Sequence, residues 1–306
     1  MPDVSFVVPL YGKAEFLPCL LDGIASQEGS FTREVVLVDD GSPDDSLAEA
    51  RRLTRGWSDV TIIAQSNAGP AAALAAGLAA ARGRYIKPMD CDDMLLPWGT
   101  RMLLEAAVDT GASIAYAPPL SQPSFTLAEG RPGMPPPVPR PSPVAPVLHD
   151  LLPATLRKAQ TQPSVWLAPR AVLAEAGSEL RVFVQDYALE LRLAAQGPAA
   201  RLDAPVVRIG RHPGQLSSNE AQVLHDVNAA LLHFLAERPD LDPRLRRYAL
   251  QRAAGRAWAW AGRHGPHSTW PSCLMNLLRT RLGLTSDAAA MLAPFLASGR
   301  VRIPAR

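Results

Sequence analysis

The hydrophobic pattern of residues 1–117 alternates short apolar runs with segments in which apolar residues recur at helical spacing. Val4–Pro9 is a continuous run of the kind typical of a central parallel strand buried on both faces. Ser46 followed by Glu49 predicts a capping box at a helix start. The alternation predicts a doubly wound α/β sheet. Strands are predicted at Val4–Pro9, Val35–Val38, Val60–Ala64, Tyr85–Met89 and Ser113–Tyr116, and helices at Phe16–Ile24, Ser46–Trp57, Ala71–Arg82 and Trp98–Asp109.

This pattern stops between Pro118 and Pro146, where 11 of 29 residues are proline. Proline lacks an N–H group and has a fixed φ, so neither a helix nor a central strand is expected. We interpret the segment as a surface loop. A second interpretation makes it a loop over an active site, on the side where an acceptor enters, and a third makes it an SH3-type ligand.

Regular patterns return after Val147 and become entirely helical from Glu220 onward. Residues 221–306 carry a net charge of +7, whereas residues 1–220 carry −5. We therefore predict a domain over residues 1–218 and a helical region over 219–306. Strands are predicted at Ser164–Ala168 and Val206–Ile209, and helices at Ala171–Ala176, Tyr187–Ala195, Ala221–Ala236, Pro243–Gly262, Pro271–Leu282 and Ser286–Leu296.

Composition narrows the classes of protein that this chain can belong to. With 306 residues, 47% of them apolar, and a net charge of +2, a basic nucleic-acid-coating protein and a disordered chain are both disfavoured. The cysteines (Cys19, Cys91 and Cys273) are far apart, which disfavours a disulfide framework and favours a reducing cytosol. No basic segment precedes the first apolar run, so the start is interpreted as a strand rather than a signal peptide.

Acidic residues follow two of the predicted strands. Asp90-Cys91-Asp92-Asp93 comes directly after one of them, and its carboxylates repel one another unless a cation lies between them. Such oxygen ligands suit Mg²⁺ or Mn²⁺, although a solvated acidic turn would have the same sequence. Asp39-Asp40 follows another strand, where an acid can accept hydrogen bonds from a nucleotide, or can simply belong to an Asp-Gly turn.

One further segment is a candidate on local grounds alone. Asn67-Ala68-Gly69 opens a helix whose backbone N–H groups could face a phosphate, although a helix start requires no ligand. No G-x-G-x-x-G or P-loop follows the first strand, which counts against dinucleotide and NTPase sites. Instead, three strand ends present Pro9-Leu10-Tyr11, Asp39-Asp40 and Asp90-Cys91-Asp92 in this order.

In this order the motifs resemble the inverting, bacterial family-2 glycosyltransferases over most of residues 4–218. The resemblance implies a GT-A-like, mainly parallel sheet flanked by helices, with a C-terminal helical extension. It implies a base pocket of Pro9, Tyr11 and Asp40, a ribose or metal contact by Asp90, and a Mn²⁺ or Mg²⁺ ion held by Asp92. Leu10, Asp39, Asn67, Gly69 and Cys91 are then expected beside the nucleotide.

The resemblance extends to two downstream segments. Asp186 in residues 184–189 matches the general base of the family, although an acid at a helix start also complements the helix dipole. His212 in residues 208–217 matches the position that completes the diphosphate or metal site, although it could be an exposed loop histidine. The chain departs from the family pattern at Gly12, at Leu74-Ala75 and at Gln185, close to the expected donor.

The expected activity is metal-dependent, inverting transfer of a sugar from a nucleotide-diphosphate donor, such as a UDP-sugar, to a hydroxyl of a glycan or lipid-linked acceptor in cell-surface glycan synthesis. The alternatives are a nucleotide-sugar-binding or partner protein without activity, and a sugar-1-phosphate nucleotidyltransferase. No nucleic-acid partner is expected, and the oligomeric state stays open. Trp258, Trp260 and Trp270 among arginines are interpreted as core aromatics or as a membrane-surface face. The expected location is the cytoplasm or the inner face of the membrane.

Overall fold

The computed structural model describes residues 1–120, 138–177, 184–210, 219–264 and 267–284, together with residues 287 and 291. The chain forms two compact units. The first comprises Met1–Leu151, Thr161–Gly177 and Gln196–Gln215. The second comprises Leu152–Gln160, Ser178–Ala195 and Leu216–Arg306, so it includes segments upstream of residue 219.

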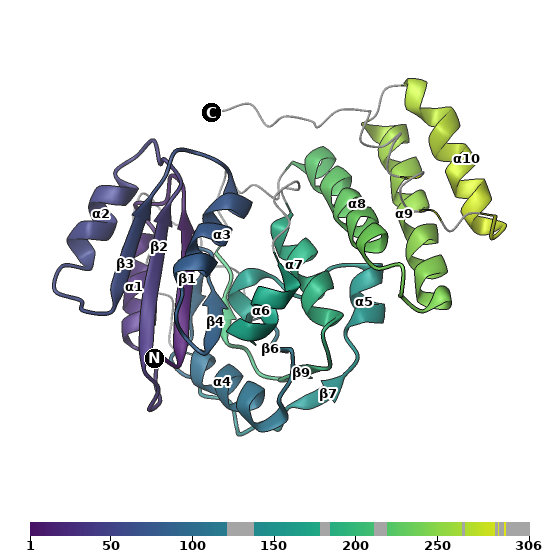
Figure 1. Ribbon diagram of the computed structural model, residues 1–306. Coiled ribbons are helices and arrows are strands. Elements are labelled where there is room, and N and C mark those ends of the chain that lie inside the picture. Colours follow the sequence, from purple (N-terminus) through teal and green to yellow (C-terminus); the bar gives the residue numbers. More distant parts are fainter. Residues whose placement is uncertain are drawn as a thin grey trace. The chain divides into compact units, whose positions relative to one another are not determined.

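The first unit is built on a sheet that has eight strands within the described residues, in the order β3-β2-β1-β4-β8-β6-β9-β7 (Figure 1). β1 pairs in parallel with β2 and β4, and β2 pairs in parallel with β3. A separate antiparallel pair joins β5 and β10. The strands are β1 (Val4–Leu10), β2 (Arg33–Asp39), β3 (Val60–Ala64), β4 (Tyr85–Pro88), β5 (Met94–Leu95), β6 (Ile114–Tyr116), β7 (Val147–His149), β8 (Trp166–Pro169), β9 (Ala199–Arg201) and β10 (Val207–Arg208).

Helices pack against this sheet, and the hydrophobic core lies between them and the strands. The apolar residues of β1 and β2 are buried on both faces, as their uninterrupted runs predicted. α3 packs closely on both strands, because a Cβ atom on Gly77 would lie 2.4 Å from Val7 Cγ1. The helices of this unit are α1 (Leu17–Ala25), α2 (Ser46–Leu53), α3 (Pro70–Ala80), α4 (Gly99–Thr110), the 3₁₀ turn Pro163–Val165 and α6 (Arg170–Ala176).

Several local predictions differ from the structure. The predicted capping box is wrong: Asp45 precedes α2 without a side-chain cap, and Glu49 pairs with Arg52 at 2.7 Å. Ser46 is instead the first helical residue, and its hydroxyl accepts from the Lys13 amide at 2.8 Å. The tertiary contact therefore determines the role of this serine. The short strands β5, β7 and β9 were not predicted, because two or three residues carry no readable periodicity.

The proline-rich segment was predicted to lack regular structure. Its described parts, residues 118–120 and 138–146, have neither helix nor strand. Arg140 within it pairs with Glu28 at 2.8 Å. Residues 121–137 lie outside the described residues, so the two functional interpretations of this segment stay predictions.

The second unit is helical. The buried Glu190 carboxylate accepts from the Thr155 hydroxyl at 2.7 Å and from the Gln160 amide at 2.9 Å, which joins α7 to α5. Trp260 is buried and donates to the Ala221 carbonyl at 3.0 Å, so this tryptophan belongs to the core. The helices are α5 (Leu152–Arg157), α7 (Gln185–Ala194), α8 (Glu220–Glu237), α9 (Pro243–Arg263), the 3₁₀ turn His267–Thr269 and α10 (Trp270–Arg281).

Three of the four predicted C-terminal helices are confirmed as α8, α9 and α10. The fourth, at Ser286–Leu296, falls almost wholly on residues outside the described part of the chain. Among the helices that the structure describes, none combines the length and the apolar character that a bilayer span requires.

Candidate active site

The carboxyl ends of β1, β2 and β4 lie at one edge of the sheet, where ligands bind in open parallel sheets. Leu10 is in register with Asp39, and the Asp40 amide donates to the Leu10 carbonyl at 2.9 Å. β4 runs beside β1 and leads into Asp90. The structure therefore brings together the three strand ends that the sequence singled out.

Asp40 organises the loop before α3. One carboxylate oxygen accepts from the Gln65 side-chain amide at 2.8 Å and from the Ala68 amide at 2.9 Å. The other accepts from the Gly69 amide at 2.8 Å. Three donors from within the chain thus already engage Asp40, and the carboxylate has room for about one more of its roughly four acceptor sites.

Asp39 is also buried, but it accepts fewer hydrogen bonds than Asp40. Its Oδ2 atom accepts from the Ser42 amide over 3.4 Å, a long hydrogen bond. Its Oδ1 atom is buried and has no hydrogen-bond partner in the described structure. Burying a carboxylate oxygen without a donor is costly, so this atom is suited to receive an N–H or O–H group from a ligand.

The loop after β1 is tied to the loop after β2. Gly12 donates to the Ser42 hydroxyl at 3.2 Å, and Ala14 donates to Asp44 at 3.1 Å. Burial alone would raise the pKa of Asp44, but hydrogen bonds from Ser46 and Ala14 together lower it. Tyr11 precedes Gly12 in this loop, is 45% exposed and can stack on a flat ligand.

The acidic turn after β4 contacts two other segments, the loop that contains Lys13 and the segment that contains Gly210. Asp92 Oδ2 forms an ion pair with Lys13 Nζ at 2.9 Å, and the same ammonium lies 5.0 Å from the centre of the Phe16 ring. Asp93 Oδ1 accepts from the Gly210 amide at 2.9 Å. A Cβ atom on Gly210 would lie 2.0 Å from the Asp92 carbonyl oxygen, so only glycine fits beside this turn.

A buried lysine lies close to the acidic turn. Lys87 in β4 is fully buried and donates to the Ser164 carbonyl, while the Ser164 hydroxyl accepts from the Asp90 amide at 2.9 Å. Burial lowers the pKa of Lys87 to about 7 and raises the pKa of Asp93 to about 7. Our sequence prediction missed Lys87 and Ser164. A lysine inside an otherwise apolar strand directly before an acidic cluster was the available signal for Lys87.

The oxygen donors of Asp90 and Asp92 fit a divalent ion of the Mg²⁺ or Mn²⁺ type. Such ions are commonly bound by one or two carboxylates and the phosphates of a substrate, and they keep several waters. Within the described residues, no three His, Cys, Asp or Glu side chains converge as a complete protein cage. His212, the other predicted ligand, lies outside the described residues. Cys91 is buried, and burial raises the pKa of its thiol.

Asp186, the predicted base, lies in the first turn of α7 in the second unit. Burial raises the pKa of its carboxyl, although the Tyr187 amide and its own amide act in the opposite direction. The neighbouring Gln185 has a buried Oε1 atom without a hydrogen-bond partner in the described structure. This end of α7 therefore presents a carboxylate of raised proton affinity beside an unused acceptor.

Comparison with solved structures shows which fold this is. A structure of residues 1–349 of S. aureus TarS in complex with UDP-GlcNAc covers 96% of this chain and 90% of its own, with a TM-score of 0.65 at 16% identity. The mannosyltransferase PcManGT from Pyrobaculum calidifontis, in complex with GDP-Man and Mn²⁺, covers 97% and 86%, with a TM-score of 0.54 at 18% identity. The fold is the GT-A fold of glycosyltransferases, as the sequence predicted.

The sequence comparison indicates a family. The model for glycosyl transferase family 2 matches residues 5–140, less than half of the chain, and confirms the predicted resemblance to this family over that segment. Over 118 residues the chain is 42% identical to the succinoglycan biosynthesis protein ExoO of Rhizobium meliloti (strain 1021). That match spans 38% of this chain and only 32%, about a third, of the relative.

Proposed function

We propose that this chain is an inverting glycosyltransferase that moves a sugar from a nucleotide-diphosphate donor, in the first instance a UDP-sugar, to a hydroxyl acceptor. The observation that carries the proposal is the unpartnered, buried Asp39 oxygen at the edge of the sheet that also holds Asp40 and the acidic turn. The match to the family-2 model and the likeness to a fold seen with UDP-GlcNAc support it.

The donor is proposed to bind along the ends of β1, β2 and β4. Tyr11 would stack on the base, with Pro9 and Leu10 beside it. Asp39 and Asp40 would accept N–H or O–H groups of the base and ribose, because each still has acceptor capacity. Asn67, Gly69, Asp90 and Cys91 complete the proposed donor site.

Asp92, with Asp90 beside it, is proposed to hold a Mn²⁺ or Mg²⁺ ion. When bound, the ion supplies Lewis-acid neutralisation of the charge that develops on a leaving diphosphate. The likeness to a mannosyltransferase structure that contains Mn²⁺ supports this role. Lys13, which already contacts Asp92, places a second positive charge near the same carboxylate. His212 stays a proposed member of this group.

Asp186 is proposed to accept the proton of the acceptor hydroxyl as that oxygen attacks the anomeric carbon. A base has to be deprotonated, and its raised pKa makes it a stronger base than an ordinary aspartate. On acidification, Asp186 should take up a proton at a pH above 3.8, which is the usual pKa of an aspartate. Transfer should therefore begin to decline above that pH. The acceptor is proposed to be a growing glycan or a lipid-linked sugar, reached from the cytoplasmic side of a membrane.

The test is Asp186→Asn, assayed separately for donor binding and for transfer. We expect unchanged calorimetric binding of UDP in Mn²⁺ and a loss of transfer of roughly 10²–10⁴-fold. Asp109→Asn, which removes an exposed acid from α4, is the matched control and should transfer normally. Equal turnover by the Asp186 variant would overturn the assignment. Nucleotide binding without transfer by the unaltered chain, across donors and acceptors, would favour a binding protein instead.

A further inference from the structure

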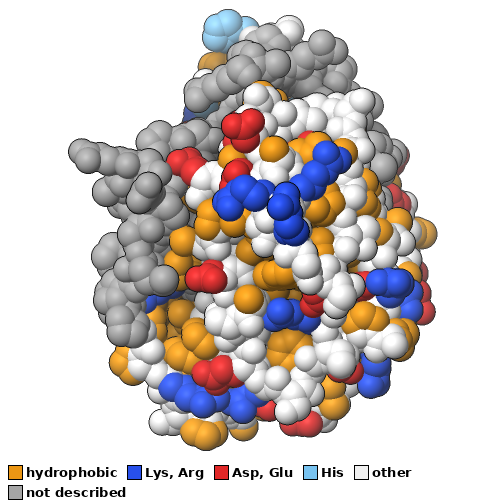
Figure 2. Space-filling view, turned by 90° about the vertical axis from the view of Figure 1, so that its left-hand side faces the viewer, with side chains coloured by type: hydrophobic (Ala, Val, Ile, Leu, Met, Phe, Trp, Pro, Cys, Tyr) orange, Lys and Arg blue, Asp and Glu red, His pale blue; other side chains and the backbone are white. Residues whose placement is uncertain are grey.

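The segment that contains α9 and α10 has an unusual charge balance. Residues 243–286 include eight arginines and no aspartate or glutamate. Acidic and basic side chains are by contrast interspersed on the face of the first unit that carries α2 (Figure 2). Arg263 forms an ion pair with Glu220 of α8 at 3.1 Å. The segment still has no acid of its own for its other arginines, and this local excess of positive charge favours an anionic partner.

α10 also exposes an apolar face. One side of the helix is buried in the second unit through Cys273, Leu277 and Thr280. On other sides, the exposed fraction is 37% for Trp270, 45% for Leu278 and 71% for Leu282. These three residues recur every four or eight positions, so they share one stripe of the helix, and Leu274 and Met275 add to it. An exposed stripe of this kind marks an interaction site.

A groove of about 370 Å³ lies at the start of α9 and is lined by Pro243, Arg244, Arg247, Tyr248 and Gln251. It adjoins the end of α10. The Gln251 side chain donates to the Thr280 carbonyl at 3.3 Å, and the Arg247 guanidinium carbon would lie 3.8 Å from a Cβ atom on Gly283. Gly283 lies between the exposed Leu282 and Leu284, so the arginine groove and the apolar stripe meet at this end of the helix pair.

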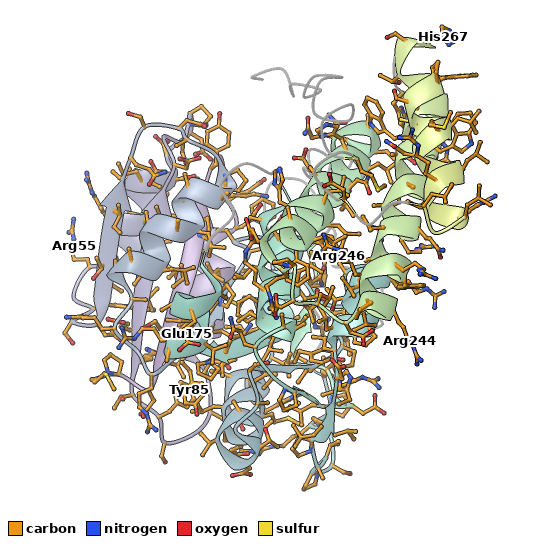
Figure 3. All side chains as sticks on the ribbon, turned by 45° about the vertical axis from the view of Figure 1, so that its right-hand side comes forward. Arg55, Tyr85, Glu175, Arg244, Arg246 and His267 are labelled. Atoms are coloured by element: carbon orange, nitrogen blue, oxygen red, sulfur yellow. The ribbon has the colours of Figure 1, made fainter. Side chains whose placement is uncertain are left out.

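The arginines near the groove differ in their contacts. Arg246 turns back to α8, where it donates to the Leu235 carbonyl at 2.6 Å. Arg244 extends away from the start of α9, at the opposite end of the helix pair from His267 (Figure 3). Arg244 and Arg247 are both exposed. Two exposed guanidinium groups beside a tyrosine form a site that suits a phosphate group.

We propose that the α9–α10 pair docks on the surface of an anionic lipid bilayer. The α10 stripe enters the boundary between headgroups and acyl chains, and Arg244 and Arg247 bind lipid phosphates. Exposed leucine and methionine side chains match acyl chains better than the polar backbone of a nucleic acid. A two-fold contact with a second copy would bring arginines together without any carboxylate from residues 243–286 to pair with them.

The test is flotation with vesicles of phosphatidylcholine alone or mixed with phosphatidylglycerol, without a sugar donor. We expect binding to the mixed vesicles only, weakened by salt. Arg244→Gln with Arg247→Gln should lower partitioning by roughly 30-fold, at about 5-fold for each arginine. Leu278→Ser with Leu282→Ser should lower it similarly. Arg55→Gln and Val108→Ser, at exposed sites of the first unit, are matched controls that should bind normally.

Each of several results would overturn the proposal. These are equal binding of both vesicle types, unchanged binding by both double variants, salt-dependent binding of duplex DNA or RNA in place of vesicles, and a dimer that the leucine variant dissociates. Far-UV circular dichroism checks that the variants, which all alter exposed side chains, are folded. Because no donor is present, failure of docking and failure of the proposed transfer are separate results.

Discussion

The two ends of the β1–β2 pair carry buried acids in opposite states. At the amino end, Ser5 is in register with Glu34. The Glu34 carboxylate accepts from four donors: the Ser5 hydroxyl and the Arg82 amide at 2.5 Å, and the Gly83 amide and the Arg82 guanidinium at 3.0 Å. At the carboxyl end, Leu10 is in register with Asp39, whose Oδ1 atom has no partner in the described structure.

One acid of this pair of strands therefore has a structural role, and the other is available to a ligand. A buried carboxylate whose acceptor sites are filled by the chain stabilises the fold and has little left to offer a ligand. A buried carboxylate with an empty acceptor site lowers stability until a ligand fills it. We therefore expect substitutions at the amino end to change stability, and substitutions at the carboxyl end to change binding and transfer.

The largest expected effect at this edge of the sheet is that of Asp92→Asn, in the turn after β4, the strand that pairs with β1. Transfer should fall by roughly 10²–10³-fold, because the substitution removes the charge proposed to hold the divalent ion. The free energy of unfolding should change by less than about 1 kcal/mol, because the ion pair with Lys13 is partly exposed. Steady-state assays and chemical denaturation measure the two. Normal transfer with a large loss of stability would reverse the comparison.

At the amino end, Glu34→Ala should lower the free energy of unfolding by about 2–4 kcal/mol, because it removes the acceptor of the Ser5 hydroxyl and of the Arg82 amide. Glu49→Ala, which removes an acid from an exposed pair with Arg52, should cost under about 0.5 kcal/mol. Urea denaturation distinguishes them. An equally stable Glu34 variant would contradict the structural role.

Glu34 should also make the stability of the fold depend on pH. Burial alone would raise the pKa of Glu34, but hydrogen bonds from Ser5 and Arg82 lower it below 4.5 overall. Its stabilising contribution is thus present above pH 4.5 and is lost as the pH falls through the lower pKa of the folded state. Glu34→Gln should flatten this part of the stability profile.

A smaller effect is expected from Asp39→Asn. The affinity for UDP should fall roughly 10-fold, by about 1.4 kcal/mol, because a charged acceptor becomes neutral. Stability should be unchanged or slightly higher, since a buried charge with an unfilled acceptor site is removed. Calorimetry and thermal unfolding test both halves. A variant that loses stability and keeps its UDP affinity would show that Asp39, like Glu34, stabilises the fold rather than binding a ligand.

The smallest effect is expected from Lys13→Met, which keeps an apolar contact with Phe16 and removes the cation beside Asp92. Without nucleotide, the affinity for Mn²⁺ should rise about 5-fold, because a competing positive charge of about 1 kcal/mol is gone. Electron paramagnetic resonance of free Mn²⁺ measures this directly. Lys158→Met, at an exposed position of the second unit, is the control. An unchanged affinity would show that Asp92 does not contribute to the ion site.

The parts of the fold that were predicted correctly are those with strong local patterns. Val4–Leu10 and Arg33–Asp39 bury residues on both faces, so their strands are visible as apolar runs. Strand β9 escaped prediction because a three-residue strand is defined by its neighbours in the sheet. Ser46 was predicted to cap a helix, but its hydroxyl accepts instead from the amide of Lys13, which lies in a loop 33 positions upstream.

The class of fold and the order of the acids could be predicted from the sequence, since strand ends in a parallel sheet meet at one edge and Asp39, Asp40 and Asp90 lie at or just after such ends. What each acid does depends on tertiary contacts. Asp40 is engaged by the loop before α3, Asp39 is left with an open oxygen, and Asp92 pairs with Lys13 across 79 positions. The physical reason is that hydrogen-bond saturation depends on donors brought close by folding, and those donors are remote in the sequence.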